Sequence, residues 1–248
     1  RPAIAFFHGG GWVFGEPATF HQAGRRFADR GYVVAVFQYR LSINEDGSYP
    51  HSDITPVEST RDARSALRWM KAQAEVLRID PDRIIASGHS VGGQLSFATA
   101  LCDEVNEPTD DLSISPRPAA LVIFSGTVNT IEAWCDDLLG DRRTEIWSIS
   151  PYHNLKPGMP PTLGFHGRDD RIVKLFPVFN FIEAVRSHGN QIDYVILDGG
   201  HNLAESDQTC SGYLNDEMLE RVDAFLAAEG LVPGAPHPPR SKPNPTAG

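Results

Sequence analysis

Short apolar segments alternate with longer amphipathic segments along most of this 248-residue chain, and this alternation restricts the fold more than any other feature. Near-continuous apolar runs indicate strands buried on both faces, at residues 2–7, 32–39, 84–87, 119–124, 161–165 and 192–197. Apolar residues at three- and four-residue intervals indicate helices at residues 20–30, 57–77, 91–101, 173–188 and 213–228. Pro177 predicts that the fourth helix begins after Val173. The pattern predicts an α/β fold with a mostly parallel sheet of at least six strands and helices on both faces.

Two segments interrupt the alternation. Residues 129–154 form a longer stretch that contains Trp134 and Trp147, and we expect a short excursion over the sheet there. Residues 233–248 contain six prolines, which argues against a regular helix or a central strand. We therefore expect one domain over residues 1–232, followed by an extended or disordered tail.

Composition argues against several classes of protein. The chain has 22 Lys and Arg against 32 Asp and Glu, a formal net charge of −10, so a general nucleic-acid surface is not expected. No run approaches the roughly 18 apolar residues that a membrane helix needs. Cys102, Cys135 and Cys210 lack metal-ligand spacing, and no metal or organic cofactor is implied.

The start of the chain bears on its processing and location. It begins at Arg1 and enters an apolar strand at once, so we expect a processed or partial product, and a signal peptide would lie upstream. Three cysteines allow one disulfide at most, which leaves the redox compartment open. A secreted or periplasmic location is favoured slightly over a cytoplasmic one, and the oligomeric state cannot be read from the sequence.

The segment Gly88–Gly92, with the sequence GHSVG, fits the G-x-S-x-G pattern of a nucleophile elbow. A predicted strand ends just before it and a predicted helix starts at Val91, which is the strand–turn–helix context that the pattern requires. A sharp turn there would present Ser90 at the end of the sheet. The competing interpretation is a chance glycine-rich turn.

A second glycine-rich segment, His8–Trp12 with the sequence HGGGW, follows the first predicted strand. Three glycines allow backbone amides to point into one cavity, where they could stabilise the oxyanion of a tetrahedral intermediate, and the amide of Val91 would add another donor. A phosphate loop is disfavoured because no Gly-Lys-Ser/Thr follows. A dinucleotide fingerprint fails because Phe14 occupies the third glycine position.

A serine nucleophile needs a base, and His201 is the best placed of the nine histidines because it follows the last predicted strand. His188 lies near the end of a helix, and His237 lies in the proline-rich tail. His166 ends a strand, where we expect it to pack. We expect the side chain of His89 to turn away from the nucleophile.

A carboxylate should orient that histidine, and two candidates follow the fifth predicted strand. Either Asp169 or Asp170 could serve, with the other as the cap of the next helix, and their chemistry leaves the choice open. The order Ser90, aspartate, His201 is the one expected for an α/β-hydrolase triad. Each group follows the carboxyl end of a different strand, where sites form in open α/β sheets.

With these motifs in place, the sequence resembles the α/β-hydrolase superfamily, most closely carboxylesterases with an HGGG loop. That branch includes hormone-sensitive-lipase-like enzymes and acetyl-xylan or feruloyl esterase-like proteins. The resemblance extends from Pro2 to about Leu231. It rests on HGGGW at 8–12, QYRLS at 38–42, DARSALRW at 62–69, DPDRI at 80–84, GHSVGG at 88–93, HGRDDRIV at 166–173 and GGHN at 199–202.

The resemblance implies roles for individual residues. The pattern HG-x-x-D-x-x-V places the family carboxylate on Asp170, and the family histidine corresponds to His201. The oxyanion-hole amides correspond to those of Gly9, Gly10 and Val91.

The chain also departs from the family pattern. His89 replaces the acidic residue that usually precedes the serine in the lipase-like branch, which favours the acetyl-xylan or feruloyl esterase-like branch. Related folds often begin with two further strands, so we expect an N-terminal piece to be missing. Without a visible cap the pocket should be rather open, with Trp12, Phe14, Trp134 and Trp147 as candidate wall residues.

The leading hypothesis is serine-dependent hydrolysis of short-chain acyl esters, with a small-molecule or carbohydrate ester, acetylated carbohydrates included, as substrate. Ser90 would be the nucleophile, His201 the base and Asp170 its partner. Two alternatives stay open: a serine peptidase with the same fold, and a non-catalytic binding protein built on it. The preference for short acyl groups rests on the resemblance.

Overall fold

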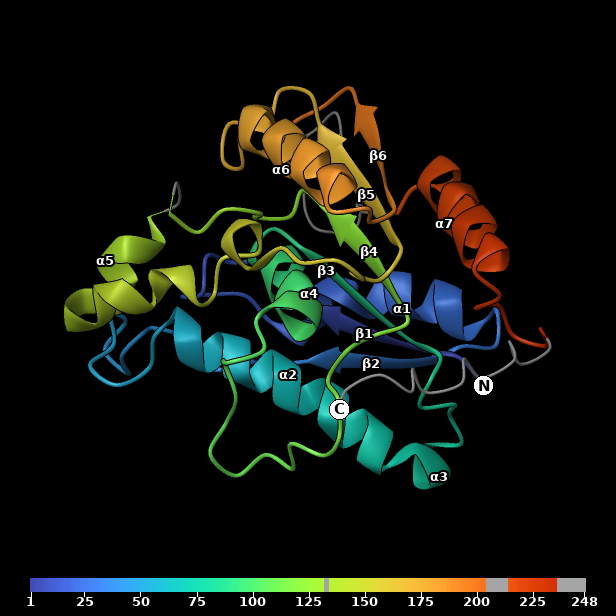
Figure 1. Cartoon of the computed structure of the whole chain (residues 1–248), viewed down its shortest axis with the longest axis horizontal. Coiled ribbons are helices and arrows are strands. Elements are labelled where there is room, and N and C mark those ends of the chain that lie inside the picture. Colours follow the sequence, from blue (N-terminus) through green and yellow to red (C-terminus); the bar gives the residue numbers. More distant parts are fainter. Residues whose placement is uncertain (132–133, 204–213, 236–248) are drawn as a thin grey trace, which may run out of the picture.

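The computed structural model describes residues 1–131, 134–203 and 214–235. Within those ranges six strands form one parallel sheet, in the order β2-β1-β3-β4-β5-β6 (Figure 1). The strands are β1 (Ala3–Phe7), β2 (Val33–Phe37), β3 (Ile84–His89), β4 (Ala120–Phe124), β5 (Thr162–Gly167) and β6 (Ile192–Leu197). The predicted strands are confirmed, and β3 and β5 each continue two residues beyond their predicted ends.

Helices cover both faces of this sheet. The helical elements are η1 (Pro17–Phe20), α1 (His21–Ala28), α2 (Pro56–Ala72), α3 (Ala74–Leu77), α4 (Val91–Leu101), α5 (Cys135–Leu139), η2 (Gly140–Trp147), η3 (Tyr152–Asn154), α6 (Leu175–Ser187) and α7 (Asp216–Ala228). On one face α2, α4 and α6 contribute Leu67, Leu95 and Phe181 to the core. On the other face α1 and α7 contribute Phe27 and Val222. The α/β prediction, with helices on both faces, is therefore confirmed.

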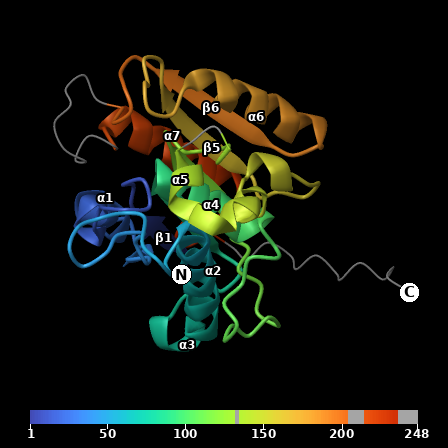
Figure 2. The same cartoon turned by 90° about the vertical axis from the view of Figure 1, so that its left-hand side faces the viewer.

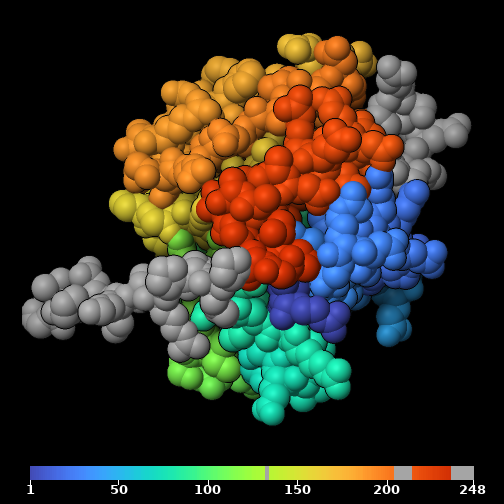
Figure 3. Space-filling view, turned by 90° about the vertical axis from the view of Figure 1, so that its right-hand side faces the viewer, coloured from blue at the N-terminus to red at the C-terminus, as the bar shows by residue number. Residues whose placement is uncertain are grey.

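The first and last helices lie side by side. Figure 3 shows α7 in red against the blue N-terminal region that contains α1. Arg30 Nε donates to Asp223 Oδ2 at 2.9 Å across this contact. Tyr213, the first residue of the predicted last helix, and residues 236–248 of the predicted tail lie outside the described residues.

Several helix boundaries differ from the prediction by a few residues, and two of the differences have a clear local cause. The predicted helix 57–77 is wrong as a single helix, because Gln73 leaves helical geometry (φ −95°, ψ 15°) and separates α2 from α3. Thr55 and Glu58 form a capping box that starts α2. The delayed start of α6, predicted from Pro177, is confirmed at Leu175.

The strand order brings two glycine-rich turns together. β1 pairs with β2 on one side and with β3 on the other, so the order of connection reverses between β1 and β3. Phe7 at the end of β1 is paired with Gly88 of β3. Because the segments that follow these strands leave the same edge of the sheet, the two motifs meet at the switch point, where α/β folds bind ligands.

The predicted excursion at residues 129–154 contains α5, η2 and η3. Figure 2 shows α5 facing the viewer, beside the start of α2. Arg142 Nη1 of η2 donates to both carboxylate oxygens of Glu58 at 3.0 Å and so attaches the excursion to α2. No helix in the described part of the chain is long and apolar enough to cross a membrane.

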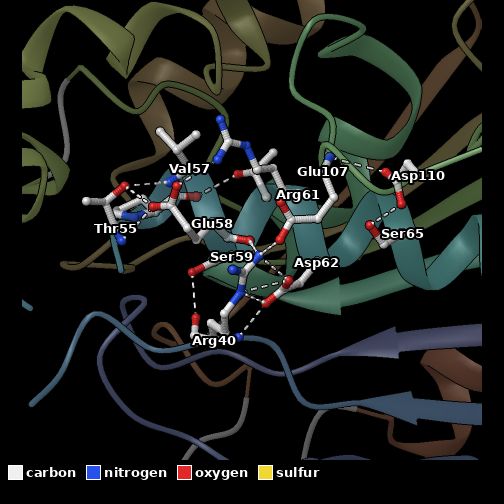
Figure 4. Close-up of polar contacts among 12 residues, drawn as sticks. Arg40, Thr55, Val57, Glu58, Ser59, Arg61, Asp62, Ser65, Glu107 and Asp110 are labelled. Carbon is white, nitrogen blue, oxygen red and sulfur yellow. Dashed lines mark hydrogen bonds and ion pairs between the residues drawn. The ribbon is translucent and has the colours of Figure 1, made fainter. Parts of the chain in front are cut away.

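Ionic contacts surround the first turns of α2 (Figure 4). Arg40 Nε donates to Asp62 at 2.9 Å, and its Nη2 also contacts Glu107. Glu58 is 5% exposed, and Arg61 Nη1 donates to it at 3.0 Å. Burial acts to raise the pKa of Glu58, but hydrogen bonds from Thr55 and Arg142 outweigh it, so the pKa lies below its usual value. The carboxylate is therefore charged at neutral pH.

Candidate active site

Ser90 occupies a strained turn between β3 and α4. Its backbone has φ 56° and ψ −120°, outside the regions that L-residues normally adopt, at a typical cost of about 1–3 kcal/mol. The Ser90 amide donates to the carbonyl of Phe124 at 3.0 Å, which ties the turn to β4. A β-carbon on Gly92 would stand 1.9 Å from the carbonyl oxygen of Phe7. The second glycine of the motif is thus required because α4 begins against the end of β1.

Asp170 and His201 form a hydrogen-bonded pair beside this turn. His201 Nδ1 lies 2.8 Å from Asp170 Oδ2, and the amides of Ile172 and Val173 each donate to Asp170 Oδ1 at 2.9 Å. Asp170 is 6% exposed, whereas Asp169 is exposed. The structure therefore brings Asp170, and not Asp169, to the histidine, and Asp170 also caps the turn that precedes α6.

A second histidine, His166, contacts the same carboxylate. Its Nε2 lies 2.8 Å from the carbonyl oxygen of Val173 and 3.3 Å from Asp170 Oδ2, and its side chain is fully buried. Burial acts to raise the pKa of Asp170, but its bonds with His166 and His201 lower it well below the usual range. Asp170 is therefore ionised at neutral pH. His166 packs at the end of β5, as expected, but its contact with Asp170 was not predicted.

The direction of the His201–Asp170 bond determines the tautomer of His201. The ionised carboxylate can only accept, so Nδ1 carries the proton, and in the neutral ring Nε2 then has a free lone pair. Ser90 and His201 line the same cavity. Within the described residues no hydrogen bond joins Ser90 Oγ to His201. Proton transfer between these two groups would therefore require a side-chain movement, since hydrogen bonds of this kind often tighten only when a ligand binds.

The loop after β1 approaches Ser90 from the neighbouring strand. Gly10 has φ +125°, and a β-carbon there would stand 1.9 Å from the carbonyl oxygen of Phe14, so only glycine fits. A β-carbon on Gly9 would stand 3.2 Å from Cβ of Ser90. Val91 is the first residue of α4, so its amide has no partner within the helix. Gly9, Gly10 and Val91 all line the cavity and could surround an oxyanion.

Two side chains missed by the sequence analysis support this loop. The Tyr39 hydroxyl donates to the backbone carbonyl of His8 at 3.0 Å. The aromatic rings of Tyr39 and His8 also stack, with centroids 4.3 Å apart. Trp12 Nε1 donates to Gln94 Oε1 on α4 at 3.2 Å. Tyr39 lies in the QYRLS motif, which is the one sequence signal that could have identified it.

The cavity has a volume of about 580 Å³ and a partly aromatic wall. Three of the four candidate wall residues line it: Trp12, which is 1% exposed, and Phe14 and Trp134, which are 62% and 44% exposed. Trp134 lies against Gly11, where a β-carbon would be 2.1 Å from its ring. Trp147 is absent from the described lining and instead packs on His153. The prediction that Trp147 lines the cavity was therefore wrong. The excursion directs the side chain of Trp134 towards the cavity and that of Trp147 towards His153.

His89 was expected to turn its side chain away from Ser90, yet it lines the same cavity as Ser90 and lies against His201. Its ring centroid lies 4.6 Å from that of His201, and its Nε2 lies 3.0 Å from the carbonyl oxygen of His201. The reason is that β3 continues through His89, so this side chain points to the same face as Ile85, the face covered by α1 and α7. Leu203 belongs to the core on that face, so the loop containing His201 lies against it.

Comparisons with known proteins place the chain among esterases. The BD-FAE family model matches residues 1–178. The apo form of Thermogutta terrifontis esterase 2 is 32% identical and superposes with a TM-score of 0.82, over 94% of this chain and 85% of that chain. The same enzyme was solved with propionate and with butyrate bound.

Within the described residues of this chain, no group of three His, Cys, Asp or Glu is placed to hold a metal ion.

Curated relatives are more distant and longer. An isoprenylcysteine alpha-carbonyl methylesterase of Arabidopsis thaliana is 23% identical, over 98% of this chain and 60% of its own length. Esterase LipC of Mycobacterium tuberculosis is 25% identical, over 82% of this chain and 53% of its own length. The chain thus spans about half to three fifths of these relatives.

Proposed function

The chain belongs to the BD-FAE family, whose relatives are carboxylesterases of the α/β-hydrolase type, and from that premise we propose that it is a serine carboxylesterase acting on short-chain acyl esters. One observation carries the proposal. His201, which is bonded to Asp170, lines the same cavity as Ser90 and the glycine-rich loop that follows β1. Nucleophile, base and oxyanion donors, which acyl transfer requires, are thus available to one bound ester.

The proposed reaction starts at Ser90. Its Oγ attacks the ester carbonyl carbon while Nε2 of His201 takes the hydroxyl proton. Asp170 accepts from Nδ1 and stabilises the imidazolium that forms. The amides of Gly9, Gly10 and Val91 donate to the oxyanion. His201 then protonates the leaving alkoxide, and a water molecule, activated by the same ring, releases the acid from Ser90.

The substrate proposal rests on the size and lining of the cavity. A volume of about 580 Å³ exceeds what an acetyl group needs, so space remains for the alcohol. Propionate and butyrate, found with the Thermogutta terrifontis enzyme, are short acids of the kind that such a reaction would release. Exposed aromatic side chains at the cavity, Phe14 and Trp134, can pack against a flat alcohol or a sugar ring. We propose small or carbohydrate alcohols, acetylated carbohydrates among them.

Hydrolysis of p-nitrophenyl esters from acetate to palmitate tests the proposal. Ser90→Ala should remove nearly all turnover, since loss of the nucleophile in a serine protease costs on the order of 10⁶ in kcat. Ser113→Ala, on an exposed loop, is the matched control and should retain wild-type turnover. Substantial turnover in Ser90→Ala would reject the mechanism. A rate that peaks at palmitate would reject only the short-chain preference.

A further inference from the structure

His89 lies between the two loops on which the proposed reaction depends. On one side its Nε2 is 3.0 Å from the carbonyl oxygen of His201. On the other side its Nδ1 faces the loop after β1, because a β-carbon on Gly9 would stand only 2.8 Å from that nitrogen. Ser90, the next residue, is therefore flanked by a side chain that touches both the base-bearing loop and the oxyanion loop.

The hydrogen bond to His201 determines the protonation state of His89. A carbonyl oxygen can only accept, so Nε2 carries the proton, and Nδ1 of the neutral ring is an acceptor directed at Gly9. Burial, with a smaller effect from the nearby His201 ring, lowers the pKa of His89 to about 3, although the hydrogen bond to the His201 carbonyl acts to raise it. Asp170 raises this pKa and His166 lowers it, both by smaller amounts. The ring is thus uncharged at neutral pH.

Glycines leave the loop that contains His201 dependent on specific contacts for its path. Two glycines precede the histidine, and Gly199 adopts φ +140°, so the local backbone has little intrinsic preference for one path. The bond from Nδ1 to Asp170 orients the ring of His201. Backbone bonds hold the residues on either side of it, because the carbonyl of Gly199 accepts from the Asp169 amide at 3.0 Å and the Leu203 amide donates to the carbonyl of Gly200 at 3.1 Å. The bond from His89 acts on the main chain at His201 itself, so it complements the bond from Asp170 to the ring in fixing where Nε2 of His201 lies.

We propose that His89 is a positioning residue: its neutral ring donates to the carbonyl of His201, packs against Gly9, and so keeps the base and the oxyanion loop at a set separation on either side of Ser90. The inference rests on the proposed esterase function. A neutral ring also suits this place, because His201 becomes a cation during the reaction and a second cation 4.6 Å away would oppose it.

Two variants separate positioning from simple packing. His89→Gln places an amide N–H near the position of Nε2, whereas His89→Leu keeps apolar bulk and removes the donor. His188→Leu, at the exposed end of α6, is the control. We expect His89→Leu to lower kcat about 10- to 100-fold, in line with small misplacements of catalytic groups, while KM changes less than about threefold. His89→Gln should recover most of the loss.

Activity is expressed per functional site, counted by complete labelling with a fluorophosphonate. If His89 has a purely structural role, His89→Gln and His89→Leu should have the same effect. Both would reduce the melting temperature or the number of labelled sites, and kcat per site would be unchanged. That result, or full activity in His89→Leu, would overturn the inference. A wild type that hydrolyses no ester would instead reject the proposed function.

Nuclear magnetic resonance of the histidine rings tests the same geometry without turnover. His89 should keep its proton on Nε2 and not titrate between pH 4.5 and 9. The Nδ1 proton that His201 shares with Asp170 should shift or broaden in His89→Leu and stay near its wild-type position in His89→Gln. Titration of His89 near pH 6.5, or a proton on its Nδ1, would overturn the inference even in an inactive protein.

Discussion

The carbonyl oxygen of Phe7 occupies the space that a β-carbon on Gly92 would need, at a separation of 1.9 Å. This contact joins the end of β1 to the first turn of α4, and it holds the two glycine-rich segments of the site together. The backbone of Phe7 belongs to the sheet and that of Gly92 to the helix, so neither residue can move aside readily.

Gly92→Ala should therefore destabilise the protein by at least about 3 kcal/mol, because the clash can be relieved only by separating α4 from β1. The free energy of unfolding in urea measures the effect. Gly200→Ala is the control, since a β-carbon there meets nothing within 4 Å. Equal stability of the two variants would show that the contact between α4 and β1 is not as tight as described.

Asp170→Asn should reduce kcat by about 10⁴, because an amide cannot hold His201 in the required tautomer or balance the imidazolium charge. Asp169→Asn should stay within about threefold of wild type, since that side chain is exposed and not bonded to His201. Steady-state kinetics on p-nitrophenyl butyrate provide kcat for Asp170→Asn, Asp169→Asn and the wild type. The reverse order of effects would assign the carboxylate to Asp169.

Stability should fall as the pH drops from about 6.5 towards 3. The pKa of His89 is lowered to about 3 by burial, whereas an unfolded histidine has a pKa near 6.5, so in this range the unfolded chain binds a proton that the folded chain does not. At pH 5 this group alone should reduce the free energy of unfolding by an amount on the order of 2 kcal/mol. Burial also lowers the pKa of His8, which acts in the same direction.

Urea unfolding at pH 7.5 and pH 5 checks this prediction. His89→Gln should lose less stability than wild type between the two conditions, and His188→Gln should behave like wild type. Asp170 and Glu58 have lowered pKa values, so their contributions are present at both pH values and are lost only in stronger acid. Identical losses in wild type and His89→Gln would contradict the assignment.

The ion pair between Arg142 and Glu58 should stabilise the excursion over α2. Arg142→Ala leaves the buried carboxylate of Glu58 with fewer donors, and we expect a loss of about 1–3 kcal/mol. The neighbouring Arg143→Ala is the control, because Arg143 is exposed and lies 3.7 Å from Asp136. A double-mutant cycle with Glu58→Gln measures the coupling in urea. A coupling energy near zero would show that the pair does not hold the excursion in place.

Trp134→Ala should raise KM for p-nitrophenyl esters several-fold with a smaller change in kcat, because the ring lines the cavity but has no part in the proposed reaction steps. Trp147→Ala removes the same ring from the same excursion, outside the described lining of the cavity, and should leave KM unchanged. Initial rates over a range of substrate concentrations provide both constants. Equal effects of the two variants would mean that they act through the excursion as a whole.

The sequence by itself determined most of the secondary structure and the positions of the two glycine-rich turns at the candidate site. Strands and helices were predictable because side-chain periodicity and proline geometry act within a few residues, as at Pro177 and the start of α6. The strained turn at Ser90 was likewise readable, since its glycines and the adjoining strand and helix are neighbours in the chain. These features need no information about distant residues.

Only the tertiary structure decided which distant residues meet. The chemistry of the loop after β5 left Asp169 and Asp170 equivalent, and the path of that loop buries one and exposes the other. His89 was expected to point away, yet the continuation of β3 and the packing of a loop 112 residues later bring it against His201. Such contacts depend on how helices and loops pack on the assembled sheet, and local propensity carries no information about that packing.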